Sequence, residues 1–179
     1  FIFMVKNTSY MFLTGPNVVR TVTGEEVSSE ELGGADAHSG KSGVAHVAAD
    51  NDARCLEQMR GLLAYLPQNC EEKPPRGKAA EPATEKAQGL DSVVPENPNK
   101  PYDMHEVIDG VMDGESFYEI HKHYADNIIV GFARLDGRSA GVVANQPLSL
   151  AGTLDIDASI KGARFVRFCD SFNIPLVVF

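Results

Sequence analysis

The stretch NIIVGFARLDGRSAGVVANQP, residues 127–147, predicts a β-hairpin and sets the class of the fold. Two apolar runs flank Asp136-Gly137, and Asp-Gly is a preferred two-residue hairpin turn. IPLVVF (174–179) predicts a buried strand. Between them, residues 154–172 predict a helix, because small and apolar residues recur at helical spacing: Ala158, Gly162, Phe165, Cys169 and Phe172. Strands and a helix in this order indicate an α/β fold rather than an all-helical one.

Residues 1–66 are predicted to mix short strands with helices. FIFMV (1–5) and SYMFLTG (9–15) have the apolar and aromatic composition of strands. Gly15-Pro16 is expected to open a helix that runs through Arg20, because proline is tolerated in the first helical turn.

Two further helices are expected in this region. Ser28 and Glu31 have the spacing of a capping box on a short helix that Gly33 ends. A longer helix begins near Asp50 and stops at Pro67. Its apolar residues recur at steps of three and four and predict one packed face: Leu56, Met59, Leu63 and Leu66.

Residues 67–101 predict an exposed linker. Seven of the ten prolines lie there among Glu, Lys and Ala, a composition too polar to pack a core. The linker separates a first domain over 1–66 from a second over 102–179, which opens with a predicted short helix in YDMHEVIDGVM (102–112). Both ends of the chain fall in strand-like runs, so we expect an internal piece of a longer protein.

Composition argues against several classes of function. The net charge is −9 and no basic stripe is present, which disfavours nucleic acid as a partner. No apolar run has the length of a membrane span, so no membrane association is expected. Three widely spaced cysteines argue against a disulfide framework and favour a reducing compartment. We expect Cys55 and Cys169 on buried helix faces.

The histidines raise the question of a metal site. No cysteine or carboxylate stands at ligand spacing beside His38 and His46, and no third ligand accompanies His121 and His123. We therefore expect ordinary polar residues and no metal.

GGADAHSGKSG (33–43) resembles a nucleotide-binding loop, but its spacing does not match the Walker A motif. A Walker A motif needs a glycine, four residues and then Gly-Lys-Ser or Gly-Lys-Thr. Gly34 lies one residue too far from Gly40, and Ala35 takes the place of the required glycine. A strand before the loop and a helix after it are also missing.

Two blocks carry a resemblance to a known family. TGPNVVRTVTGEEVSSEELGGADAHSGKSGVAH (14–46) and the residues from NIIVGFARLDGRSAGVVANQP to the end of GTLDIDASIKGARFVRFCDSFNIPL (127–176) resemble the carboxyltransferase, or β, subunits of biotin-dependent acyl-CoA carboxylases. Within that family the resemblance is strongest to propionyl-CoA carboxylase β chains. The Gly-Lys of the apparent nucleotide motif falls at variable positions of the family pattern.

The resemblance implies a crotonase-like (ClpP/crotonase) α/β fold, with parts of two ββα-type domains joined by the linker. It implies transfer of a carboxyl group from carboxybiotin to propionyl-CoA, giving methylmalonyl-CoA. Biotin would be carried by a partner α subunit, which also holds the biotin carboxylase that alone uses ATP. A homo-oligomer of β subunits is implied as well.

The resemblance also implies which residues line the pocket. The family's two Gly-rich oxyanion motifs are expected before Phe1 and after Phe179, so no catalytic residue is assigned and these residues alone are expected to be inactive. In the family, each site forms between the first domain of one subunit and the second domain of another. The implied lining residues are Gly33, Gly34, Ala35, Ser42, Gly43, Val44, Ala144, Asn145, Gln146 and Pro147.

Other interpretations stay open. Asp155 and Asp157 could be an acid/base pair, although a helix cap explains them better. Arg134 and Arg138 could contact a CoA phosphate or simply be solvated. A methylmalonyl-CoA transcarboxylase or decarboxylase subunit, or a non-catalytic assembly piece of the same fold, would share these patterns. The family implies the mitochondrial matrix in a eukaryote and the cytoplasm in a bacterium.

Overall fold

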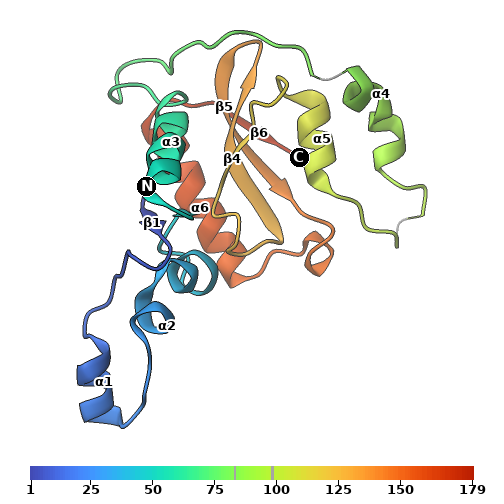
Figure 1. The fold of residues 1–179 in the computed structure, drawn as a ribbon. Coiled ribbons are helices and arrows are strands. Elements are labelled where there is room, and N and C mark those ends of the chain that lie inside the picture. Colours follow the sequence, from blue (N-terminus) through green and yellow to red (C-terminus); the bar gives the residue numbers. More distant parts are fainter. Residues whose placement is uncertain (83, 98) are drawn as a thin grey trace. The chain divides into compact units, whose positions relative to one another are not determined.

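The computed structural model describes residues 1–82, 84–97 and 99–179 (Figure 1). The chain divides into two compact units. Unit 1 comprises Phe1–Arg60 and His121–Tyr124, and unit 2 comprises Gly61–Ile120 and Ala125–Phe179. The domain limits expected from the sequence, 1–66, 67–101 and 102–179, stay a prediction.

Unit 1 is built around two short parallel strands. β1 (Phe3–Val5) pairs with β2 (Val47–Ala49), and Met4, Ala35 and Ala45 form a small core beside them. The helical elements are α1 (Pro16–Thr23), α2 (Ser29–Gly33), a π-helical turn (Ala37–Lys41) and α3 (Asp52–Leu63), whose last turn belongs to unit 2.

Local signals placed two of these helices correctly. Pro16 is the first residue of α1, as predicted, and the helix continues past Arg20 to Thr23. The capping box before α2 is confirmed, because the Ser28 hydroxyl accepts from the Glu31 amide while the Glu31 carboxylate accepts from the Ser28 amide. These contacts lie within four residues, so they need no tertiary structure to form.

The strand predicted over residues 9–15 is wrong. No strand lies there; the Met11 amide donates to the Gly33 carbonyl over 2.8 Å. The side chains of Tyr10, Met11, Phe12 and Leu13 are exposed. A strand needs a partner along its length, and apolar composition alone does not supply one.

The packed face predicted for α3 is also wrong. Leu56, Met59 and Leu63 are exposed, whereas Leu62 is the buried residue of this helix. Helical spacing groups residues on one side of a helix, but the tertiary structure decides which side is covered.

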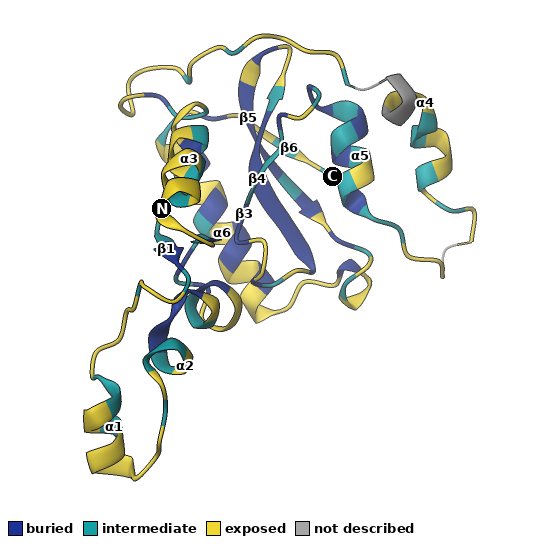
Figure 2. Cartoon of the chain, viewed as in Figure 1, coloured by how far each residue is buried: buried dark blue, intermediate teal, exposed yellow. Residues whose placement is uncertain are grey.

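Unit 2 contains a four-stranded sheet in the order β3-β4-β5-β6 (Figure 1). The strands are β3 (Tyr118–Ile120), β4 (Ile128–Leu135), β5 (Arg138–Asn145) and β6 (Leu176–Val178). Helix α5 (Met104–Val111) lies on one face and α6 (Ile156–Ser171) on the other. Both central strands are buried (Figure 2), as expected for a sheet covered on both faces.

The two faces of β4 meet different helices. On one face, Ile108 and Met112 pack with Ile129, Ala133 and Val142. On the other face, the ring of Phe132 meets that of Phe165 of α6 at 5.0 Å. The alternation of side chains along a strand therefore distributes a nearly continuous apolar run between two helices.

The predicted hairpin, helix and cap of unit 2 are confirmed. Asp136 and Gly137 both have positive φ, 51° and 71°, as a primed two-residue turn requires. Asp155 caps α6, its carboxylate accepting from the Ala158 amide over 2.8 Å. Cys169 is buried, and burial raises the pKa of its thiol to about 12; Cys55 is only half-buried.

The expectation that 174–179 is a buried strand is only partly met. β6 pairs in parallel with β5, so the strand exists, but it is an edge strand. Leu176 and Val178 are exposed on one face of the strand, whereas Val177 between them packs against the core on the α5 face.

The segment 67–101 is not wholly irregular. It contains α4 (Thr84–Val93), which packs near α5. Before α4 in the sequence, the Gly77 amide donates to the Gly137 carbonyl over 2.7 Å. The Pro-rich composition did not indicate either feature.

The carboxylate of Asp113 holds the hairpin turn in place. It accepts from the amides of Asp136 over 2.9 Å and Gly137 over 2.8 Å, and Asp113 is 6% exposed. A buried carboxylate with two amide donors anchors the turn to the end of α5.

We predict that Asp113→Ala lowers the free energy of unfolding by about 2–4 kcal/mol, because the amide of Asp136 and the buried amide of Gly137 lose their acceptor. Urea unfolding of the polypeptide that carries these residues measures the change. Asp157→Ala, at an exposed carboxylate in the first turn of α6, is the control and should change stability by only a few tenths of a kcal/mol. Equal losses in the two variants would contradict the anchoring role of Asp113.

Candidate functional site

The Gly33–Ala35 segment closes α2 in unit 1. All three residues are buried, and Ala35 is fully buried. Gly34 follows the helix with extended backbone, so no left-handed stop ends α2. A Cβ on Gly33 would lie 2.3 Å from the Met11 carbonyl oxygen. Gly33 is therefore required by the close approach of another backbone segment.

The π-helical turn that follows holds a Ser–His pair. His38 Nε2 lies 2.5 Å from the Met11 carbonyl oxygen, and Nδ1 lies 2.8 Å from the Ser42 hydroxyl. A carbonyl only accepts, so Nε2 carries a proton and, in the neutral ring, Nδ1 accepts from Ser42. Lys41 ends this turn and is exposed. The Gly-Lys-Ser run thus does not form the strand–loop–helix arrangement of a nucleotide site.

Gly43 and three aromatic side chains form the next part of unit 1. Gly43 has φ 63°, and a Cβ there would lie 2.6 Å from the Tyr124 ring. Its carbonyl lies 3.0 Å from Nε2 of the buried His121. The rings of His121 and His46 are 4.2 Å apart. His123, by contrast, is exposed, so the His121-x-His123 pair does not converge.

The residues Ala144–Pro147 lie at the end of β5 in unit 2. Ala144 belongs to the core on the α5 face. The Asn145 side-chain amide donates to the Gly152 carbonyl over 2.7 Å. Gln146 is 6% exposed, and its side-chain oxygen accepts from the Met104 amide over 3.1 Å. The turn is thus tied both to the loop that follows it and to the start of α5.

The loop after this turn is strained. Leu150, Ala151 and Gly152 all have positive φ, at 47°, 52° and 70°. Two successive non-glycine residues in the left-handed region cost about 1–3 kcal/mol each and are concentrated at functional sites. This strain could not be predicted from the sequence, since only Gly152 belongs to a residue type that favours the conformation.

His105 lies in a cluster of polar groups beside Gln146. Its Nδ1 is 2.7 Å from Asp103 Oδ1 and its Nε2 is 3.3 Å from Glu119 Oε2. The hydrogen bond to Glu119 and then that to Asp103 outweigh burial and raise the pKa of His105 to about 9. Burial would raise the pKa of Asp103, but hydrogen bonds from Gln146 and His105 prevail and lower it. The imidazole is therefore charged at neutral pH.

Lys161 of α6 is a second titratable group that the sequence did not single out. It is 1% exposed, and its ammonium donates to the Ala125 carbonyl over 3.2 Å. Burial lowers its pKa to about 8, against the opposing effect of Glu119 and Asp126. From the sequence alone, a lysine within a predicted helix cannot be distinguished from a solvated one, because its burial depends on how the helix packs.

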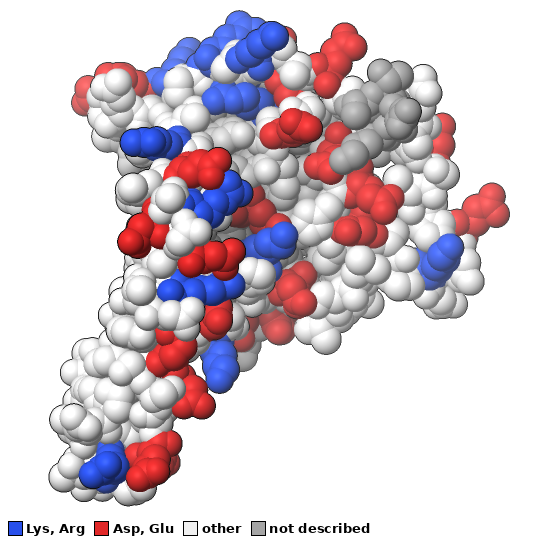
Figure 3. Space-filling model, in the orientation of Figure 1, with Lys and Arg blue, Asp and Glu red and all other residues white. Residues whose placement is uncertain are grey.

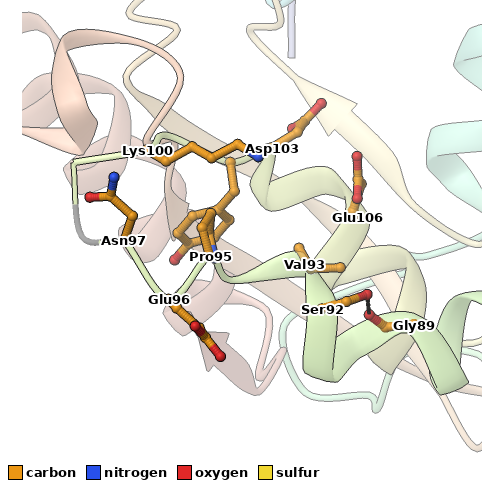
Figure 4. A pocket seen from close by; sticks show the side chains of 10 residues that line it. Gly89, Ser92, Val93, Pro95, Glu96, Asn97, Lys100, Asp103 and Glu106 are labelled. Atoms are coloured by element: carbon orange, nitrogen blue, oxygen red, sulfur yellow. Dashed lines mark hydrogen bonds between the residues drawn. The ribbon is translucent and has the colours of Figure 1, made fainter.

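Of three hollows described in unit 2, two are lined in part by the segment 67–101. One, of about 800 Å³, is lined by α4, the loop after it and the start of α5, and includes Asp103 and Glu106 (Figure 4). The other, of about 440 Å³, is lined by Lys73, Arg76 and Arg138 among others. Lys and Arg gather over the 67–82 segment and the β4–β5 turn (Figure 3). The first hollow borders the His105 cluster through Asp103.

Arg134 has a structural role. Its guanidinium donates to the carbonyls of Ala64, Pro75 and Gly137 at 2.7, 3.1 and 3.0 Å. It also lies 4.9 Å from the centre of the Tyr65 ring. Of the two alternatives for Arg134, simple solvation is therefore wrong, because backbone carbonyls satisfy most of its donors. Arg138 is exposed.

The sequence over its whole length identifies the family. The Carboxyl transferase domain family matches residues 1–179, and the chain belongs to it. The chain is 56% identical over 179 residues to the propionyl-CoA carboxylase carboxyltransferase subunit of Haloferax mediterranei, covering all of this chain and 35% of that protein. It is 51% identical to the human mitochondrial propionyl-CoA carboxylase β chain, covering all of this chain and 33% of that protein.

A solved structure gives the same result. Transcarboxylase 12S with methylmalonyl-CoA and methylmalonic acid bound is 45% identical, with a TM-score of 0.93 over 99% of this chain and 34% of that one. The crotonase-like α/β fold implied by the resemblance is confirmed. The chain spans about a third of the length of these relatives.

The described residues lack two kinds of feature. Residues 1–82, 84–97 and 99–179 contain no group of three or more His, Cys, Asp or Glu side chains placed to hold a metal ion. No helix in that part of the chain is long and apolar enough to cross a membrane.

We predict that Gly33→Ala lowers the free energy of unfolding by about 1–3 kcal/mol, because the new methyl group overlaps the Met11 carbonyl. Gly89→Ala in α4 is the matched control: nothing lies within 4 Å of its Cβ, and alanine is the better helix former by up to about 1 kcal/mol. Chemical denaturation compares them. If Gly33→Ala left the free energy of unfolding unchanged, the backbone at Met11 would have to move aside at no cost.

We predict a pH-dependent contribution of His105 to stability. Its folded pKa lies above the ordinary value of 6.5, so the contribution is complete below pH 6.5 and is lost as pH rises through about 9. The full shift corresponds to about 3 kcal/mol, and partial exposure of the side chain reduces our expectation to about 1–2 kcal/mol.

Urea unfolding of the wild type and His105→Gln at pH 6 and pH 10 measures this contribution. The comparison with the variant is needed because Lys161, whose pKa is lowered to about 8, makes stability rise between about pH 8 and 10.5. A difference between the two proteins that is the same at both pH values would rule out the charge of His105 as its source.

Proposed function

We propose that the protein carrying this chain is the carboxyltransferase subunit of a biotin-dependent propionyl-CoA carboxylase. It transfers a carboxyl group from carboxybiotin to the α-carbon of propionyl-CoA and so produces methylmalonyl-CoA. The observation that supports this most is the 56% identity, over the whole chain, to a propionyl-CoA carboxylase carboxyltransferase subunit.

The chain's own residues would shape and orient rather than react. Carboxyl transfer to an α-carbon passes through an enolate-like anion, which preorganised backbone N–H groups stabilise. Gly33, Gly34 and Ala35 would form one wall of the pocket, with Ser42, Gly43 and Val44 beside them. The close packing of Gly33 on Met11 and of Gly43 on Tyr124 favours a rigid wall.

Ala144–Pro147 would form the biotin side of the pocket. When bound, biotin would carry the carboxyl group that is transferred. Its ureido ring is neutral and hydrogen-bonding, and this turn is suited to it: the exposed amide of Asn145 is oriented by its bond to Gly152, while the buried amide of Gln146 supports the turn from within. Neither position holds a charged side chain that binding would have to desolvate.

The partners follow from the same proposal. A partner subunit would carry the biotin and the ATP-dependent biotin carboxylase, and β subunits would associate so that the first domain of one faces the second domain of another. In a eukaryote the complex would lie in the mitochondrial matrix; the human relative's name gives the mitochondrion for that protein.

A transcarboxylase is the second candidate, favoured by the match to transcarboxylase 12S. The two functions share the acyl-CoA half-reaction and differ in the source of the carboxyl group. A carboxylase takes it from bicarbonate with ATP, whereas a transcarboxylase takes it from a keto acid.

The test uses the full-length protein purified with its biotinylated partner. We expect labelled bicarbonate to enter methylmalonyl-CoA only when ATP and propionyl-CoA are both present. Label that arrives from oxaloacetate without ATP would instead support the transcarboxylase, and no labelled methylmalonyl-CoA from either source would refute both the carboxylase and the transcarboxylase.

We predict that Asn145→Ala lowers kcat/KM for this reaction on the order of 10–100-fold, because the turn loses its bond to Gly152 and misplaces the biotin side of the pocket. The KM for propionyl-CoA should change little. Asn99→Ala, at an exposed residue, is the control. Equal kinetics in both variants would remove Ala144–Pro147 from the site.

A further inference from the structure

Every polar atom of the Gln146 side chain is held by the protein. The side-chain oxygen accepts from the amides of Met104 and Leu148 at 3.1 and 3.4 Å. The side-chain nitrogen donates to Asp103 Oδ1 over 2.7 Å. The orientation of the amide, and with it the shape of the turn, therefore depends on where the Asp103 carboxylate lies.

Asp103 in turn depends on His105. The single oxygen Oδ1 of Asp103 accepts from the backbone amide of His105 at 2.9 Å, from His105 Nδ1 at 2.7 Å and from Gln146. On the opposite side of the ring, Nε2 faces Glu119 of β3 at 3.3 Å. An imidazolium donates to both carboxylates at once.

The neutral ring cannot satisfy this arrangement. It carries one N–H, so one of its nitrogens would present a lone pair to a carboxylate oxygen. Loss of the proton from Nδ1 would also free that nitrogen as an acceptor 3.2 Å from the Gln146 side-chain nitrogen, in competition with Asp103. Deprotonation thus changes the set of partners open to Gln146.

We propose that His105 is a positioning residue: in its charged form it fixes Asp103, and Asp103 fixes the Gln146 side of the biotin pocket. This inference rests on the proposed function, because it assigns the turn to that pocket. His105 contacts no reacting group itself. Its effect reaches the site through one carboxylate and one amide.

The charged groups around His105 define the pH range. Asp103 comes from the start of its own helix and Glu119 from β3, and Glu119 also acts on Lys161 of α6. The edge of the Phe117 ring packs near the imidazole at 6.2 Å between ring centres. Since the pKa of His105 is about 9, the pocket should keep its shape at neutral pH and lose it in mild alkali.

The experiment measures the KM for free biotin as carboxyl acceptor from methylmalonyl-CoA, between pH 7 and 10, in the full-length subunit. In the wild type we expect the KM for biotin to rise on the order of 10-fold with a midpoint near pH 9, while the KM for methylmalonyl-CoA stays constant. His105→Gln should have the raised KM at every pH and no midpoint.

A second variant keeps the test decisive if His105→Gln does not fold. Asp103→Asn retains a helix cap and an acceptor for Gln146 but removes one carboxylate from His105. The midpoint should then move downward by about one pH unit or more, an effect that a purely structural role would not produce. His123→Gln, at an exposed histidine, should follow the wild type.

The outcomes separate the two hypotheses. A wild-type subunit that transfers no carboxyl group to biotin would refute the proposed function. An active subunit whose KM for biotin does not change with pH, or whose midpoint is unmoved by Asp103→Asn, would overturn the role of His105 alone.

Discussion

The carboxylate of Asp113 holds the β4–β5 turn, and the arrangement of unit 2 depends on that contact. Asp136 and Gly137 can form a tight turn by themselves, but the hydrogen bonds that their amides donate to the Asp113 carboxylate fix the turn against the end of α5. The register of the two central strands follows from the turn, and with it the faces that meet α5 and α6. The position of Ala144–Pro147 at the far end of β5 is a consequence of the same register.

The two sets of proposed pocket residues are held in place by different physics. Gly33 and Gly43 are positioned by steric exclusion, since other groups occupy the space that a Cβ would need. Gln146 is positioned by charge and hydrogen bonding, through Asp103 and His105. The first kind of support does not respond to pH, whereas the second does. The biotin side of the proposed pocket is therefore the part we expect to respond to conditions.

Burying the charged groups of His105, Glu119 and Lys161, wholly or in part, costs free energy, because each of them leaves water. His105, Glu119 and Lys161 do not compensate that cost through one ideal pair; the raised pKa of His105 and the lowered pKa of Lys161 show that they are unequally satisfied. Such a cluster contributes less to stability than to the choice of a single geometry. A cluster of this kind suits a site where the Gln146 amide must be held in one orientation, and it is less suited to filling a core.

The sequence by itself determined the features that depend on neighbouring residues. The capping box at Ser28, the turn at Asp136-Gly137 and the cap at Asp155 were predictable because their partners lie within a few positions. The family, and through it the fold, was predictable from two long ordered blocks. Tertiary structure alone decided which apolar faces are covered, why Gly33 must lack a side chain, and that His105 and Gln146 meet across 41 residues. Periodicity groups residues on one element, but contacts between distant segments depend on the packing of the whole chain.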